Sequence, residues 1–320
     1  MTEVATSRIP PLAFDPIGEA LHALRMSGAF YCRSDLSAPW GVELPAMPEH
    51  LMFHVLTKGN CSLEVDGEMV RLAEGDVVLV PHGTGHTLRG EPEDQAVPLF
   101  ETERQLITDR YEWLSLGGGG EATRMICGAV QLGHPVAKRI VDVLPNCIRW
   151  KAAMEQGGPI CSSISLLIAE MDAWGVGGET LVTRLSDILV IQILRHWLET
   201  EGASSAGWLA ALKDGQVGKA LQAIHRRPNA MWSLGELASE AGMSRSAFAA
   251  RFQELIGEPP MRYLRDWRMQ MALERLSTGK ETIAQLAEDF GYESEAAFSR
   301  AFKRVIGSAP GAFRKRSVRS

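Results

Sequence analysis

The spacing of apolar residues divides the chain into three parts. Up to residue 133, short apolar runs separated by Gly, Pro and Asp-Gly turns are typical of β-strands. From 134 to 206, apolar residues recur at helical spacing and predict a helical connector. From 207 to 320, short helical patterns alternate with glycine-containing turns. We therefore expect an α+β protein with a β-rich N-terminal domain, a helical connector and an all-α C-terminal domain.

The N-terminal part predicts many short, closely spaced strands, which is the pattern of a closed barrel or a sandwich. Asp66-Gly67 lies between two of these runs and is a hairpin signal. The expected strands are Phe30–Arg33, Leu51–Thr57, Cys61–Val65, Val77–Pro81 and Thr123–Leu132.

The connector predicts helices over Val136–Leu144, Ile164–Trp174 and Leu181–Leu198. The last of these has apolar residues on nearly all sides, so it must be buried on more than one face. One partner is the chain's own β-rich domain, and the other is either a second copy of the chain or further intramolecular core. The loop Glu201–Ala206 is the expected interdomain linker.

The C-terminal part contains an internal repeat. Seven positions match across a fifty-residue offset, including the glycine and the proline that follow the second helix, and the turn glycines match at an offset of 49. The match is therefore not that of two merely similar helices. Each copy predicts a helix, a tight turn at Gly242 or Gly291, and a second helix. Ser233 with Glu236 forms the sequence pattern of a capping box before the first copy. A long helix over Met261–Leu276 is expected to join the two copies and fix their separation.

The charge is distributed unevenly between the two halves. The first 212 residues hold 15 Lys and Arg against 27 Asp and Glu, a net charge of −12, whereas the last 108 hold 18 against 12, a net of +6. A basic half in an acidic chain indicates contact with a polyanion, although solvated surfaces can also vary by chance. Together with the repeat, this charge predicts binding to double-stranded DNA.

The outward faces of the second helix in each copy are the expected DNA-binding surfaces. Arg can bond two acceptors on a guanine edge, while Lys and Ser suit phosphates. In the first copy the candidates are Arg245, Ser246, Ala249, Ala250 and Arg251, and in the second they are Glu295, Ala296, Ser299, Arg300 and Lys303.

These segments resemble a known family. LGELASEAGMSRSAFAARFQELIGEPPMRYL and IAQLAEDFGYESEAAFSRAFKRVIGSAPGAFR are similar to the two helix-turn-helix units of AraC/XylS transcriptional regulators. The resemblance covers about a third of the chain and implies a seven-helix DNA-binding domain with two reading helices. Ala249 and Ala250 stand where many members carry large polar residues, so the first helix is expected to favour thymine methyls or DNA shape.

The segment GDVVLVPHGTGH, from Gly75 to His86, resembles the second signature of the cupin barrel. The first signature's His-x-His pair is missing, and HLMFH, from His50 to His54, takes its place. The arrangement is similar to the sensor cupins that precede some AraC-type DNA-binding domains. The resemblance implies a cupin-like barrel that senses a small molecule or a metal.

His54, His82, His86 and Cys127 are the candidate metal ligands. By strand parity His54 faces inward, and His86 occupies the histidine position of the signature. Three imidazoles and a thiolate suit tetrahedral zinc, which would be structural because four protein ligands close its coordination sphere. The alternative is that His82 is exposed, His54 and His86 are hydrogen-bonded core histidines, and Cys127 is a small buried apolar residue.

Two function classes remain. The first is a transcription regulator that acts as a homodimer, binds promoter DNA and has RNA polymerase as a further expected partner. The second is a cupin-type metal-dependent enzyme with a helical appendage, which would need open metal positions that the missing His pair does not supply. We expect the regulator. Five cysteines without a CxxC pair, together with the absence of a signal peptide or membrane span, favour the cytoplasm.

Overall fold

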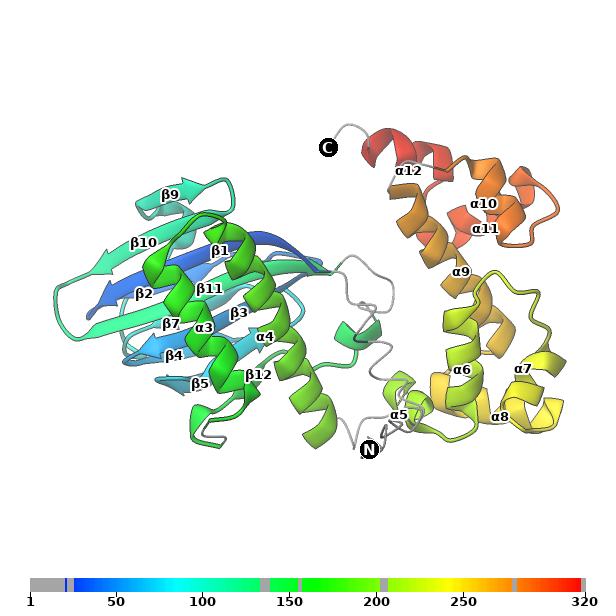
Figure 1. Ribbon diagram of the computed structural model, residues 1–320, viewed down its shortest axis with the longest axis horizontal. Helices are drawn as coiled ribbons and strands as arrows, with labels where there is room; N and C mark the ends of the chain where they lie inside the picture. The colour runs from blue at the N-terminus through cyan, green and yellow to red at the C-terminus, as the bar shows by residue number, and fades with distance from the viewer. Residues whose placement is uncertain are drawn as a thin grey trace, which may run out of the picture. The chain divides into compact units, whose positions relative to one another are not determined.

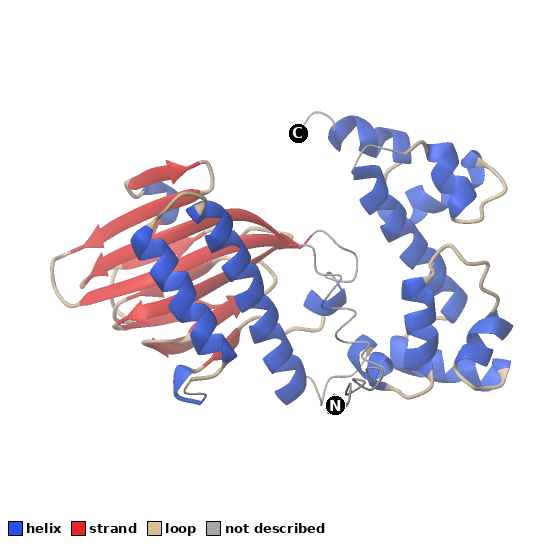
Figure 2. Cartoon of the chain, viewed as in Figure 1, coloured by secondary structure: helices blue, strands red, loops and turns tan. Residues whose placement is uncertain are grey.

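The computed structural model describes residue 21 and residues 26–132, 139–154, 157–201, 207–277 and 281–317 (Figures 1 and 2). Its described residues from 26 to 201 form one compact unit, and those from Gly207 onward form another. The first unit contains two β-sheets and two long helices, and the second is entirely helical, as Figure 2 shows. The expected α+β class is therefore confirmed.

The first unit is built on two sheets that face each other in the manner of a cupin jelly roll. The larger sheet has the order β12 (Ile148–Trp150), β6 (Val77–Val80), β3 (His50–Lys58), β11 (Ala122–Leu132), β1 (Met26–Ser37), β10 (Tyr111–Gly117) and β9 (Arg104–Thr108). The smaller has the order β5 (Glu68–Ala73), β4 (Asn60–Val65), β7 (His86–Arg89), β2 (Gly41–Leu44) and β8 (Val97–Pro98). Two short 3₁₀ turns, η1 (Leu99–Glu101) and η2 (Ala152–Met154), complete the unit.

The hydrophobic core of this unit lies between the two sheets. It combines inward residues of the large sheet, such as Met52 and Leu56, with Leu63 and Leu88 of the small sheet. Because successive residues of a strand point to opposite faces, alternate positions of each strand supply this core. The unit is thus two packed sheets rather than one continuously hydrogen-bonded barrel.

The hairpin predicted at Asp66-Gly67 is confirmed between β4 and β5. Both residues have positive φ, 49° for Asp66 and 77° for Gly67, which is the requirement of a two-residue turn that matches strand twist. Gly83, in the segment that resembles the cupin signature, has a different constraint. A Cβ there would lie 2.0 Å from the carbonyl oxygen of Met47, so only glycine lets this turn pack against the preceding loop.

Helices α3 (Pro159–Ala173) and α4 (Gly178–Thr200) lie side by side across the outer face of the large sheet (Figure 1). The aromatic ring of Trp174, at the end of α3, lies 4.3 Å from that of Tyr111 on β10, measured between centroids. On α4, Val182, Leu189 and Ile193 are fully buried. Helices α3 and α4 of the predicted connector are therefore an integral layer of the first unit, whereas residues 136–138 of its first predicted helix and 202–206 of the predicted linker lie outside the described residues.

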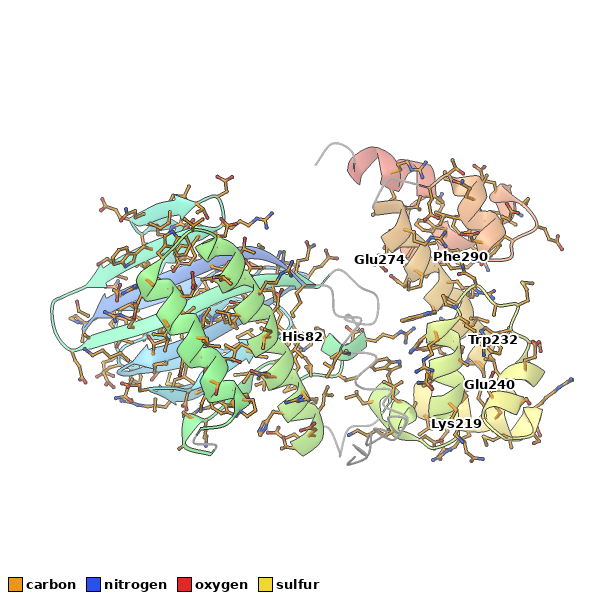
Figure 3. All side chains as sticks on the ribbon, viewed as in Figure 1. His82, Lys219, Trp232, Glu240, Glu274 and Phe290 are labelled. Carbon is orange, nitrogen blue, oxygen red and sulfur yellow. The ribbon has the colours of Figure 1, made fainter. Side chains whose placement is uncertain are left out.

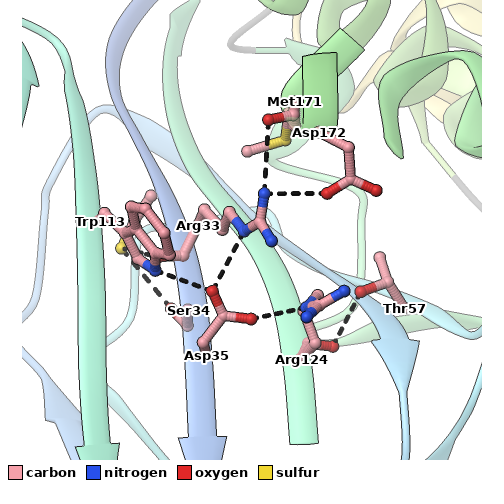
Figure 4. A network of polar contacts seen from close by, with 9 residues as sticks. Arg33, Ser34, Asp35, Thr57, Trp113, Arg124, Met171 and Asp172 are labelled. Carbon is pink, nitrogen blue, oxygen red and sulfur yellow. Dashed lines mark hydrogen bonds and ion pairs between the residues drawn. The ribbon is translucent and has the colours of Figure 1, made fainter. Parts of the chain in front are cut away.

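A polar network also ties α3 to the sheet (Figure 4). Arg33 forms an ion pair of 2.8 Å with Asp172 and one of 3.1 Å with Asp35. Asp35 also accepts hydrogen bonds from Arg124 and from the Trp113 indole. Burial raises the pKa of Asp35, but these cationic and hydrogen-bonding partners together outweigh it and hold the pKa below its ordinary value.

The second unit contains two helix-turn-helix units joined by one long helix. The first comprises α7 (Leu234–Glu240) and α8 (Arg245–Ile256), and the second comprises α10 (Ile283–Asp289) and α11 (Glu295–Ile306). Helix α9 (Pro260–Ser277) joins them, while α5 (Trp208–Lys213), α6 (Val217–Arg226) and α12 (Pro310–Ser317) pack alongside.

The helix ends follow the local sequence signals. Ser233 and Glu236 form a complete capping box at the start of α7, and Thr282 with Gln285 forms the equivalent box at α10. Ser244 and Ser294 cap α8 and α11, the second helix of each unit, through their hydroxyl groups. The capping box predicted at Ser233 and Glu236 is therefore confirmed.

Candidate functional sites

Each reading helix is held by two buried phenylalanines on its inner face. Phe248 and Phe252 of α8, and Phe298 and Phe302 of α11, are all fully buried. Their spacing of four residues places them on one side of each helix, so the opposite side faces solvent. The fifty-residue repeat is therefore a repeat of the residues that orient the two reading faces.

The outward face of α11 is exposed and carries positive charge. Arg300 and Lys303 are exposed, and neither forms an ion pair among the residues that the structure describes. Glu295 and Ala296 are exposed in the first turn, and Ser299 is half-buried beside them. All five candidates thus lie on one surface, with the two cations available to an external anion.

The face of α8 differs in one respect. Arg245, Ser246 and Ala250 are exposed, and Ala249 is half-buried. Arg251, however, forms ion pairs of 3.1 Å with Asp214 and 3.0 Å with Glu254. Asp214 also accepts hydrogen bonds from backbone amides at the start of α6, so the Arg251 guanidinium connects α8 to the α5–α6 junction.

Two arginines of α9 hold the helix-turn-helix units, and sequence reasoning missed both. Arg268 donates to the carbonyl oxygens of Pro228 and Ala230, at 2.8 and 2.7 Å, and so fixes the loop before α7. Trp232 of the same loop and Glu240 of α7, both labelled in Figure 3, contact Arg227. Arg275 pairs with carboxylates at the two ends of α10, Glu281 and Asp289. No sequence motif marks these contacts, because their partners lie in loops or on another helix, 6 to 40 residues away in the sequence.

A second candidate site is an apolar cavity of about 100 Å³ inside the first unit. It lies between the two sheets and near η1, and it is lined by side chains from β1, β2, β3 and β11. Its polar side chains are His54 and Cys127. The apolar lining includes Phe30, Leu44, Met47, Met52, Leu99 and Phe100.

His54 and His86 form a buried bridge between the sheets. His54 is on β3 of the large sheet and His86 on β7 of the small one, and their Nε2 atoms are 2.7 Å apart. Burial lowers the pKa of both imidazoles, and for His54 the neighbouring His86 adds to this effect. Cys127 lies directly opposite His54 on β11, and burial raises the pKa of its thiol.

His82 lies apart from this pair. Its Nε2 donates to the carbonyl oxygen of Leu144 at 3.0 Å, and Figure 3 shows it beside the short helical turn near residue 140. Over the described part of the chain, no three His, Cys, Asp or Glu side chains are gathered as metal ligands. The arrangement therefore does not fit the expected four-ligand zinc site. Zinc binding by the protein stays a prediction.

Among the described helices, none is long and apolar enough to cross a membrane.

Two helix-turn-helix units with outward reading faces, joined to a cupin-type domain, define a DNA-binding transcription regulator. Sequence comparison agrees: residues 15–199 match the cupin family, and residues 237–316 match a helix-turn-helix domain.

The chain belongs to the AraC-like transcription regulators. It is 32% identical to a putative AraC-like transcription regulator of Streptomyces lividans over 304 residues, which cover 94% of this chain and 98% of that protein. It is 27% identical to the HTH-type transcriptional regulator AlkR of Acinetobacter baylyi over 312 residues, covering 95% and 100%. The protein is thus a regulator and not an enzyme.

Solved structures give a match to the DNA-binding part. The DNA-binding domain of AdpA, crystallised with a target DNA, is 27% identical and covers 32% of this chain and 92% of its own, with a TM-score of 0.31.

Proposed function

We propose that the protein is a sequence-specific regulator whose two reading helices bind promoter DNA under the control of an effector in the cupin cavity. The observation that supports specific binding is the pair of outward helix faces, each oriented by two buried phenylalanines. Such helices enter successive major grooves when their separation is about 34 Å. The dependence of DNA affinity on salt concentration tests the binding itself.

The two faces are proposed to read DNA differently. Arg300 is exposed, without an ion pair in the described chain, and is long enough to reach a guanine edge. Lys303, one turn further along α11, is placed to contact phosphate. On α8, Ala249 and Ala250 offer only methyl groups, which suit thymine methyls or a purely shape-based fit.

The cavity supports the sensing role. It is enclosed by both sheets and is mostly apolar, with a few polar groups, as ligand sites usually are. The helices α3 and α4 cover the other face of the large sheet, and the Arg33–Asp172 ion pair joins that sheet to α3, so a change in sheet packing around a ligand would reach α3. The effector is therefore proposed to act through this sheet.

The outer surface of α3 and α4 supports dimerisation with a second copy of the chain. Leu166, Leu181 and Ile188 are 59%, 48% and 46% exposed on this surface, although each is a large apolar residue. Leu181 and Ile188 are seven residues apart and so lie on one stripe of α4. A twofold interface would let each copy cover the stripe of the other.

Ile188→Asp is expected to raise the dimer dissociation constant about tenfold or more, because a charge would be placed within an apolar interface. Sedimentation equilibrium of the full chain measures this. Val176→Asp is the matched control, since Val176 is fully exposed in the turn between α3 and α4. Ile193 is unsuitable as a probe because it is fully buried, so its replacement would unfold the unit. A wild-type protein that is monomeric at micromolar concentration would rule out this interface.

A further inference from the structure

His54, which lines the cavity, has one buried polar atom whose hydrogen-bonding capacity is unused. His54 is 1% exposed, and its Nδ1 has no partner among the described residues. Its other ring nitrogen is engaged by His86. An unpaired polar atom in such a place costs stability, so a partner supplied by a ligand would be favourable.

The hydrogen bonds around His86 fix which atom carries each proton. His86 Nδ1 lies 2.8 Å from the carbonyl oxygen of Thr84, and a carbonyl oxygen only accepts, so this nitrogen donates. In a neutral imidazole the other nitrogen then has no proton, and Nε2 of His86 accepts. The neighbouring Nε2 of His54 must therefore donate across the 2.7 Å contact.

The same reasoning assigns the remaining atom. A neutral His54 that donates through Nε2 has a lone pair on Nδ1, so the unpartnered atom is an acceptor. The carbonyl of Thr84 thus determines, through two imidazoles, that the unpartnered nitrogen of His54 is an acceptor. Both rings are almost fully buried, at 1% and 3% exposure, which favours their uncharged forms.

We propose that the cavity binds a small apolar molecule that carries a hydrogen-bond donor, and that this donor bonds to Nδ1 of His54. This inference rests on the proposed sensing role of the cavity. Molecules with N–H or O–H groups on a compact apolar body fit, whereas anions and pure acceptors do not, because His54 offers them no proton.

The size of the cavity restricts the ligand further. Its volume of about 100 Å³ is smaller than the engineered cavity of about 150 Å³ that binds benzene. Met47 and Met52 line it, and their flexible side chains allow limited expansion. A five-membered ring is therefore a suitable probe.

Pyrrole and furan make a direct test, since they have nearly the same shape and differ by an N–H donor in place of an oxygen acceptor. We expect the full-length protein to bind pyrrole about tenfold more tightly than furan. Pyrrole can donate a hydrogen bond to Nδ1 of His54, whereas furan leaves this acceptor unsatisfied. Isothermal titration calorimetry at millimolar ligand measures both constants.

Variants locate the effect. His54→Phe keeps a ring but removes the acceptor, so the pyrrole-to-furan ratio should fall to about one. His86→Phe retains His54 but removes the acceptor that fixes the tautomer of His54, so the pyrrole-to-furan ratio should also fall. His50→Phe makes the same change on the same strand but outside the cavity lining, so it should keep the wild-type ratio.

The contrary outcomes are distinct. Furan binding as tightly as pyrrole would overturn the donor assignment and leave the sensing cavity intact. Binding of neither compound would overturn the sensing cavity as well, while DNA binding by the same preparation would still stand. Stoichiometric zinc in untagged protein, lost in Cys127→Ser, would also overturn the inference, because a metal would occupy the imidazole nitrogens.

Discussion

Replacing Asp76 with alanine is expected to lower the free energy of unfolding of the cupin domain by about 3 kcal/mol. Asp76 is 3% exposed and accepts hydrogen bonds from Arg149 at 2.6 Å and from the backbone amides of Ala152 and Ala73, each at 3.0 Å. Loss of the carboxylate would leave these donors unpaired and detach β12 from β6. Urea denaturation monitored by tryptophan fluorescence measures the change.

Glu91→Ala is the matched control for this prediction. Glu91 also pairs with an arginine, Arg71, but both side chains are more than half exposed. Water screens such a pair, so its loss should cost less than about 1 kcal/mol. Equal destabilisation by the two substitutions would show that the buried network around Asp76 is not what holds β12.

Arg300→Ala is expected to reduce discrimination between the best site and single-base variants of it by about 1–3 kcal/mol at one base pair. The guanidinium can bond two acceptors of guanine, and no other base pair presents both in the same place. Competition binding of the full chain to a set of operator variants measures the ranking. An unchanged ranking would show that Arg300 does not read a base.

Lys303→Ala provides the comparison on the same helix. Lys303 is exposed one turn from Arg300, and an ammonium group contacts phosphate as a point charge. Its loss should weaken binding to all sites alike and reduce the slope of log affinity against log salt by about one. If Lys303→Ala instead weakened binding only at sites that differ at one base pair, Lys303 would be a base-reading residue and not a phosphate contact.

The helical domain was predictable because its signals are local. Capping by Ser233, Ser244 and Ser294 and the turns at Gly242 and Gly291 depend on residues three or four positions apart. The repeat then identified which positions are buried and orient the second helix of each unit. The ion pairs of Arg251 and Arg275 were missed because their partners, such as Asp214 and Asp289, lie 37 and 14 residues away and follow no periodic pattern.

The β domain was predicted less completely. The apolar runs predicted β3, β4, β6 and β11, but the edge strand β12 has only three residues and is defined by long-range pairing, as Ile148 with Leu79 shows. The parallel pairing of β1 with β10 likewise joins residues about eighty positions apart, such as Tyr31 and Tyr111. Local propensity carries no information about such contacts.

The cavity residues illustrate the same limit. Strand parity placed His54 inward, and the register of β3 with β11 brings Cys127 beside it. His82 follows β6 at a turn, where alternation no longer determines direction, and it bonds to Leu144 instead. The proton assignment of the His54–His86 pair depends on the carbonyl of Thr84, which no side-chain motif could reveal.

DNA binding is tested most directly by the affinity of the full-length protein for double-stranded DNA as a function of salt. Lys and Arg that neutralise phosphates release condensed counterions, so the affinity should fall steeply with salt. With about six to ten phosphate contacts, we expect a loss of about 10³–10⁵-fold between about 50 and 200 mM salt. An affinity that stays flat over this range would contradict the assignment of the basic helical domain as a DNA-binding domain.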